Sequence, residues 1–176
     1  LDFYHKYYHP SNSYIYLYGD MDVKERLEWM DRAYLSAYES MEIDSNIPMQ
    51  KPFDAMKFVE TTFPITDDDP EENNTYLSYN MVIADVLDPT LYQAFTVLDY
   101  VLVSAPGAPV RQALIDAGIG QDVYGSYENE MLQPFFSIVA KNANKEDKDR
   151  FVRIIEDTLQ NLVENGLNKD SLLAGI

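Results

Sequence analysis

The sequence predicts an α+β fold in which a mainly antiparallel sheet of about five strands carries helices on one face. Short runs rich in aromatic and β-branched residues alternate with longer runs whose apolar residues recur at helical spacing. Four of the strand-like runs come in consecutive pairs, which favours hairpins and therefore antiparallel pairing. At 176 residues, with no repeat and no internal boundary, we expect a single domain over residues 1–176.

The chain is expected to begin with a helix, a turn and a strand. Residues 2–9 have the pattern of a helix end that Pro10 stops, because proline cannot continue a helix. Ser11 and Asn12 can bond nearby backbone groups and turn the chain. The tyrosine-rich run 13–19 that follows is a predicted strand, and the pair Gly19-Asp20 closes it.

The second predicted helix begins at Asp22, which resembles the start of a capping box with Glu25 three residues later. Its apolar residues recur at helical spacing, which predicts a helix packed on one face. These residues are Leu27, Met30, Tyr34, Tyr38 and Met41.

Residues 57–65 and 75–85 are strand-like, and the acidic, turn-rich stretch 66–74 lies between them. Together they predict a hairpin with a long acidic loop. The second half of the chain contains further predicted elements: a helix capped by Asp88 with Pro89 at its first position, a short helix over 110–117, strands over 122–128 and 134–142, a long helix from Asn144 to Gly166, and a last helix from Asn168.

The charge balance excludes two classes of partner. Against 13 Lys and Arg residues stand 30 Asp and Glu residues, a net charge of -17. Phosphate groups bind mainly through Lys and Arg, so we expect no nucleic-acid partner, and an anionic membrane surface is equally unfavourable. High solubility is the simplest meaning of this charge, and attraction of cationic peptide segments is the functional alternative.

The chain has no cysteine, which excludes disulfides, thiolate zinc sites and cysteine catalysis. No apolar run is long enough to span a bilayer and no signal peptide is visible, so we expect a cytoplasmic protein, with an organelle matrix as the alternative. The chain begins at Leu1 rather than Met and stops at Ile176 within a helical pattern. We therefore expect it to be truncated at both ends from a larger protein.

No catalytic or metal-binding set is complete. His5 and His9 have the i, i+4 spacing of zinc ligands on a helix, but Lys and Tyr occupy the places where a zinc peptidase needs a glutamate. The chain has no third histidine. We therefore predict no catalytic residue, no metal ligand and no cofactor in this chain. The acidic loop 66–74 lacks the glycine and ligand spacing of a calcium loop.

Two motifs carry a family resemblance. The stretch around Tyr8, His9, Pro10, Ser11 and Asn12, followed by the strand and by Gly19 and Asp20, resembles the opening of the second domain of pitrilysin/insulinase-type zinc metallopeptidases, and the presequence-protease subfamily most of all. The run 108–120 is similar to that family's Ser-Pro-Leu-x-x-x-Leu-x-x-x-Gly-Leu-Gly motif, with Ala108 and Val110 in place of its serine and leucine.

The resemblance implies a non-catalytic domain. The zinc motif H-x-x-E-H would lie in a preceding catalytic domain of the same polypeptide, and this domain would help to form a chamber for unstructured peptide substrates. The signature residues would be structural. One alternative is a domain of a catalytically inactive structural or binding homologue, and another is an autonomous acidic interaction module. The residues before Leu1 would separate the first two, because H-x-x-E-H is either present or absent there.

Overall fold

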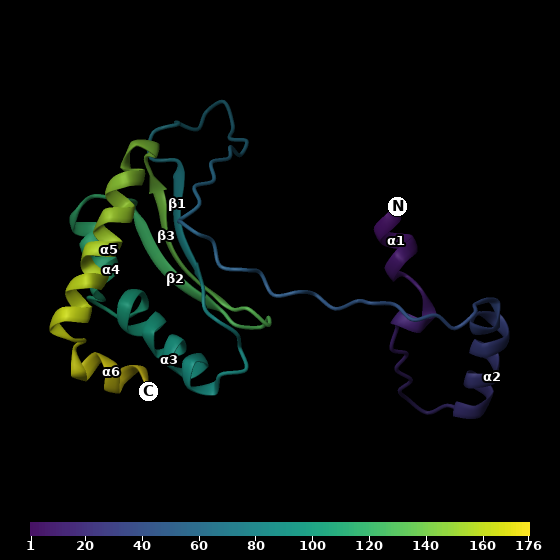
Figure 1. The fold of residues 1–176 in the computed structure, drawn as a ribbon. Coiled ribbons are helices and arrows are strands. Elements are labelled where there is room, and N and C mark those ends of the chain that lie inside the picture. Colours follow the sequence, from purple (N-terminus) through teal and green to yellow (C-terminus); the bar gives the residue numbers. More distant parts are fainter. The chain divides into compact units, whose positions relative to one another are not determined.

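The computed structural model describes residues 1–176, which form two compact units, residues 1–49 and residues 50–176. The second unit contains the sheet and the hydrophobic core, and the first contains short helices only (Figure 1). Each unit is described by itself below. The expected single domain over residues 1–176 stays a prediction.

The first unit contains helices α1 (Asp2–Tyr7) and α2 (Val23–Ala33) and two 3-10 turns, Pro10–Asn12 and Leu35–Ala37. The predicted cap of α2 is confirmed, because the Asp22 carboxylate accepts a hydrogen bond from the Glu25 backbone N–H at 3.0 Å. The helix ends earlier than expected, since Tyr34 leaves helical geometry with φ -141° and ψ -59°.

The apolar side of α2 does not reach a core. No residue of the first unit is buried, and Leu27, Tyr38 and Met41 are each at least 44% exposed. The prediction of a helix packed on one face is therefore wrong for this unit. A chain below about 70–80 residues rarely encloses a core by itself, which is the physical reason.

Residues 13–19 do not form the predicted strand. Ser13 is extended, with φ -129° and ψ 151°, but no backbone ladder includes the run. Tyr14, Tyr16 and Tyr18 are at least 85% exposed. A strand needs a partner for its backbone groups, and the first unit offers none.

The sheet of the second unit has three strands: β1 (Thr75–Val82), β2 (Asp122–Glu128) and β3 (Phe135–Ala143). Their order is β1-β3-β2 and both pairings are antiparallel, so these three predicted strands are confirmed. Residues 57–65 lie outside the sheet, and β1 pairs with β3 instead of with them. The α+β class is thus confirmed, whereas about five strands is not.

The helices of the second unit cover one face of the sheet (Figure 1). They are α3 (Pro89–Asp99), which continues as a π-helical turn (Tyr100–Ser104), α4 (Pro109–Asp116), α5 (Lys148–Asn165) and α6 (Lys169–Gly175). The predicted cap of α3 is confirmed, because the Asp88 carboxylate accepts hydrogen bonds from the backbone of Thr90 and Leu91.

The core lies between these helices and the sheet. On β3, Phe136, Ile138 and Ala140 face the helices and are at most 1% exposed. They pack with Phe151 and Ile155 of α5, which the apolar periodicity of that helix predicts. This core holds the sheet against the helices. In the strand order β1-β3-β2, β1 lies at one edge of the sheet.

Candidate functional site: the turn after the first helix

The two histidines do not share a helix face. Helix α1 ends at Tyr7, and Tyr8 has φ -88° and ψ 80°. His9 is extended, with φ -142° and ψ 146°, and caps the 3-10 turn Pro10–Asn12. The interpretation of residues 2–9 as one helix was therefore two residues too long, and the zinc-ligand spacing of His5 and His9 is absent from the structure.

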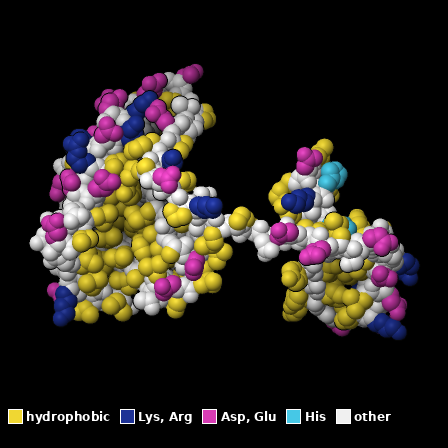
Figure 2. Space-filling view, viewed as in Figure 1, with side chains coloured by type: hydrophobic (Ala, Val, Ile, Leu, Met, Phe, Trp, Pro, Cys, Tyr) yellow, Lys and Arg dark blue, Asp and Glu magenta, His cyan; other side chains and the backbone are white.

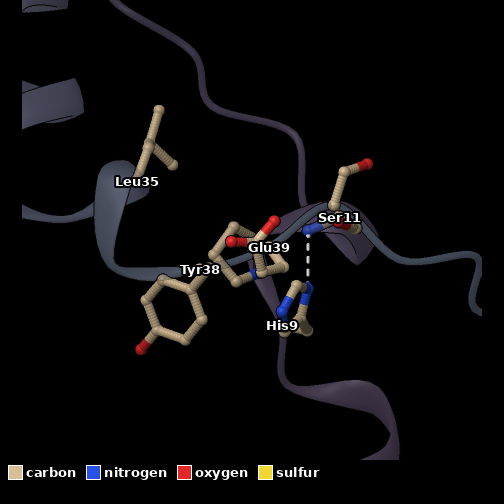
Figure 3. Close-up of a pocket in the computed structure, with 7 residues that line it drawn as sticks. His9, Ser11, Leu35, Tyr38 and Glu39 are labelled. Carbon is tan, nitrogen blue, oxygen red and sulfur yellow. Dashed lines mark hydrogen bonds between the residues drawn. The ribbon is translucent and has the colours of Figure 1, made fainter.

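The His9 ring is held by its own turn (Figure 3). Its Nδ1 accepts a hydrogen bond from the Ser11 backbone N–H at 3.1 Å, so in the neutral ring the proton lies on Nε2. The ring also meets the Tyr38 ring edge-on, with centroids 5.2 Å apart. His9 thus caps a turn, a role in which serine, threonine and aspartate are more common.

Hydrogen bonds link the other residues of the turn to both sides of the chain. The Asn12 amide donates to the Tyr7 carbonyl at 3.0 Å, and the Ser13 hydroxyl donates to the Pro10 carbonyl at 2.8 Å. The Met41 backbone N–H donates to the Ser11 hydroxyl at 3.2 Å. Residues 9–13 therefore join the end of α1 to the segment that follows α2.

Tyr8, the first residue of the signature, stacks on Tyr4 with ring centroids 4.7 Å apart. Gly19 has φ +120°, a conformation that other residues rarely adopt, so a glycine is required where the chain turns toward α2. Asp20 is exposed and forms no hydrogen bond or ion pair with the turn. The structure thus brings residues 8–12 together at the turn. Gly19 and Asp20 take no part in the hydrogen bonds of this turn.

The turn borders a shallow open pocket (Figure 3). Its lining consists of His9, Pro10, Ser11, Leu35, Tyr38, Glu39 and Ser40. Glu39 is the single carboxylate in this lining and His9 the single imidazole. No group of three or more His, Cys, Asp or Glu residues in the chain is placed to hold a metal ion.

One polar residue in the second unit was not singled out as a site from the sequence. Asp99 ends α3 where the π-helical turn begins, and its Oδ2 accepts a hydrogen bond from the Ser104 hydroxyl at 3.1 Å. Its Oδ1 is buried without a partner. Burial raises the pKa of this carboxyl, and the Ser104 hydrogen bond opposes that rise. An acid within the apolar run 92–105 was the available signal.

None of the helices combines the length and the apolar character that crossing a bilayer requires.

The sequence profile described as "Peptidase M16 inactive domain" matches residues 1–175. Protein HypA of Clostridium perfringens is 43% identical over 176 residues, which is 100% of this chain and 18% of that protein. Presequence protease 1, chloroplastic/mitochondrial, of Arabidopsis thaliana is 31% identical over 99% of this chain and 16% of its own length. The mitochondrial presequence protease of Danio rerio is 26% identical over 98% of this chain and 17% of its own length.

The chain therefore spans less than a fifth of the length of these relatives. The match covers nearly all of its residues, including both motifs on which the resemblance rested. The predicted relation to pitrilysin/insulinase-type metallopeptidases is confirmed. This chain belongs to the peptidase M16 inactive-domain family.

Proposed function

We propose that this chain is an accessory, non-catalytic domain of a zinc-dependent peptidase that degrades unstructured peptides. It packs beside the catalytic domain of the same polypeptide and helps to form the substrate chamber. The match of the inactive-domain profile to residues 1–175 carries this proposal. The capping role of His9 supports it, because that ring nitrogen is already engaged with the Ser11 backbone.

The exposed apolar side chains support the presence of a neighbouring domain. Tyr14, Tyr16 and Tyr18 in the first unit are almost fully exposed, and so are Val163 and Ile176 in the second. Figure 2 shows hydrophobic side chains gathered over the region of α3 and α5. Broad exposed apolar surfaces mark places where another protein surface packs.

The names of the relatives support a peptide substrate. Two of the relatives described above are named presequence proteases, and a peptidase of this kind acts on peptide chains. The net charge of -17 favours cationic segments over anionic ones. We place the parent protein in the cytoplasm, and the mitochondrial and chloroplastic names of the relatives make an organelle matrix the alternative compartment.

The experiment compares the parent protein with the isolated chain. We expect the parent to contain about one zinc per polypeptide and to hydrolyse an unstructured peptide until a chelator is added. The isolated chain binds no stoichiometric zinc and cleaves nothing. Removing residues 1–176 from the parent should abolish hydrolysis, and adding the domain back should restore it in part. Chelator-sensitive hydrolysis by the isolated chain would contradict the proposal.

The second candidate is a domain of a catalytically inactive structural or binding homologue. The 43% identical relative is named Protein HypA, a name that states no activity. The two functions predict different sequences upstream of Leu1. An active peptidase has the motif H-x-x-E-H and binds zinc, whereas an inactive homologue has neither.

A further inference from the structure

Helix α5 ends in the dipeptide Asn165-Gly166, which is the one Asn-Gly pair of the chain. The backbone nitrogen of the residue that follows an asparagine can attack the asparagine Cγ, because the two atoms then close a five-membered ring. A side chain on the following residue hinders this attack, and glycine has none. Every other asparagine of the chain precedes a residue with a side chain. Asn165 is therefore the asparagine with the least steric protection against this reaction.

The last turn of α5 is exposed, in contrast to the first half of the helix. Phe151 and Ile155 are at most 1% exposed, whereas Val163 is 80% exposed. Asn165 and Gly166 are exposed as well. A turn that buries so little apolar surface opens at a small cost in free energy. The backbone at this dipeptide is therefore free to leave the helical conformation.

Two hydrogen bonds must break before the reaction. The Gly166 backbone N–H donates to the Leu162 carbonyl at 2.9 Å, and the Asn165 side-chain amide donates to the Asn161 carbonyl at 3.2 Å. The first bond engages the attacking nitrogen, and the second holds the group that this nitrogen attacks. Both bonds belong to the final turn of a helix, where fraying is common, so one local opening releases the two groups together.

We propose that Asn165 is a site of spontaneous deamidation, at which the folded chain acquires aspartate or isoaspartate. The Gly166 nitrogen gives up its proton and forms a bond to Asn165 Cγ, while the bond from Cγ to Nδ2 breaks and the amide leaves as ammonia. Water then opens the resulting succinimide ring. Cleavage of the bond between Cγ and the ring nitrogen gives aspartate, and cleavage of the bond between the Asn165 carbonyl carbon and that nitrogen gives isoaspartate. Water is the single co-reactant, and no atom is oxidised or reduced.

The product residue loosens the connection between α5 and α6. Its carboxylate cannot donate to the Asn161 carbonyl as the amide does, and a negative charge is unfavourable at the C-terminal end of a helix. Isoaspartate also adds one carbon to the backbone, directly before the residues that hold α6 in place. These are Leu167, which packs against the core, and Asn168, which caps α6 by accepting a hydrogen bond from the Ser171 backbone N–H at 2.9 Å.

Peptide mapping by mass spectrometry tests the site in the folded wild-type chain. After incubation at mildly alkaline pH, the peptide that contains Asn165 should gain the mass difference between an amide and an acid, with fragment ions assigning the residue. Asn161, which lies one turn earlier in the same helix and precedes Leu162, is the internal control and should react at least about ten times more slowly. Asn165→Gln should lose the reaction, because its longer side chain would have to close a less favourable six-membered ring. Equal rates at Asn161 and Asn165 would overturn the proposal.

Unfolding separates the effect of the structure from that of the dipeptide. In urea the dipeptide reacts at its intrinsic rate, and opening of the last turn should keep the rate in the folded chain within about a hundredfold of that value. Reaction in urea with none in the folded chain would show that the two hydrogen bonds protect Asn165, which contradicts the proposal.

Hydrogen exchange measures the consequence for α6. The modified chain should exchange the amides of residues 165–172 at least about three times faster than the fresh chain. Asn165→Gln, incubated in the same way, should show no increase, which separates this effect from general ageing of the sample. Unchanged exchange in the modified chain would show that the connection between α5 and α6 tolerates the product residue, against the proposed loosening.

Discussion

Gly125 of β2 lies directly against the carboxylate of Asp99: a Cβ built on residue 125 would be 2.5 Å from Asp99 Oδ1 and 3.0 Å from Val103 Cβ. Asp99 and Val103 belong to α3 and its π-helical continuation, so this contact joins the helix layer to the sheet. The absence of a side chain at residue 125 is what allows the close approach.

We expect Gly125→Ala to lower the free energy of unfolding by about 1–3 kcal/mol, because the added Cβ would overlap the Asp99 carboxylate and crowd the Val103 side chain. Val103 is fully buried, and the carboxylate oxygen is enclosed. Ser126→Ala, on the other face of the same strand, should change stability by no more than about 0.5 kcal/mol. Urea unfolding of the two variants measures the difference. Similar midpoints for both would show that the helix layer shifts to accept the methyl group.

Asp99 should make stability depend on pH. Burial raises the pKa of its carboxyl in the folded chain, so the folded state retains the proton to a higher pH than the unfolded state. The contribution of Asp99 to the free energy of unfolding is therefore complete below the pKa of the unfolded state, about 3.9. It is lost as the pH rises through the pKa of the folded state. Asp99→Asn carries no such loss. Relative to the wild type, this variant should gain stability as the pH rises above the unfolded-state pKa of the Asp99 carboxyl.

Ser104→Ala is the matching variant, because it removes the hydrogen bond that lowers the pKa of Asp99. In this variant the loss of stability should extend to higher pH. Thermal unfolding at several pH values measures both effects. A difference between Asp99→Asn and the wild type that stays constant with pH would show that Asp99 does not titrate in this range.

The two neighbouring phenylalanines at the start of β3 allow the stability contributions of core packing and surface packing to be compared. Phe136 is 1% exposed among the core residues, whereas Phe135 is half-buried on the opposite face. We expect Phe136→Ala to cost about 3–5 kcal/mol, because it leaves a cavity. Phe135→Ala should cost about 1–2 kcal/mol. Equal costs in denaturant unfolding would mean that the face without helices is covered in solution.

The sequence predicted those elements whose signals are local and whose burial the chain itself supplies. The caps Asp22 and Asp88 and the strands of the second unit are of this kind. Residues 13–19 and 57–65 have the same alternation, but a strand also needs a partner, and no local pattern states whether one is present. Sequence period alone therefore overestimates the number of strands.

The residues of the candidate site also fall into two groups: those whose local structure the sequence predicted and those for which the prediction failed. Pro10, Ser11 and Asn12 form the turn that their residue types predict, because each acts on backbone groups within a few residues. The spacing of His5 and His9 indicated a shared helix face only if the helix reached His9. Helix ends are the least certain part of a sequence pattern, and here the helix ends at Tyr7.

His9 and His5 provide the last test, because a structural and a metal-binding role predict different outcomes. The His9 ring accepts the Ser11 N–H, whereas the His5 side chain forms no hydrogen bond. We expect His9→Ala to destabilise the turn by about 1 kcal/mol, the usual cost of a lost cap, and His5→Ala to have little effect. Hydrogen exchange over residues 9–13 measures the change, and zinc content is followed in parallel. If the two histidines held a metal together, both variants would lose zinc and loosen the turn equally.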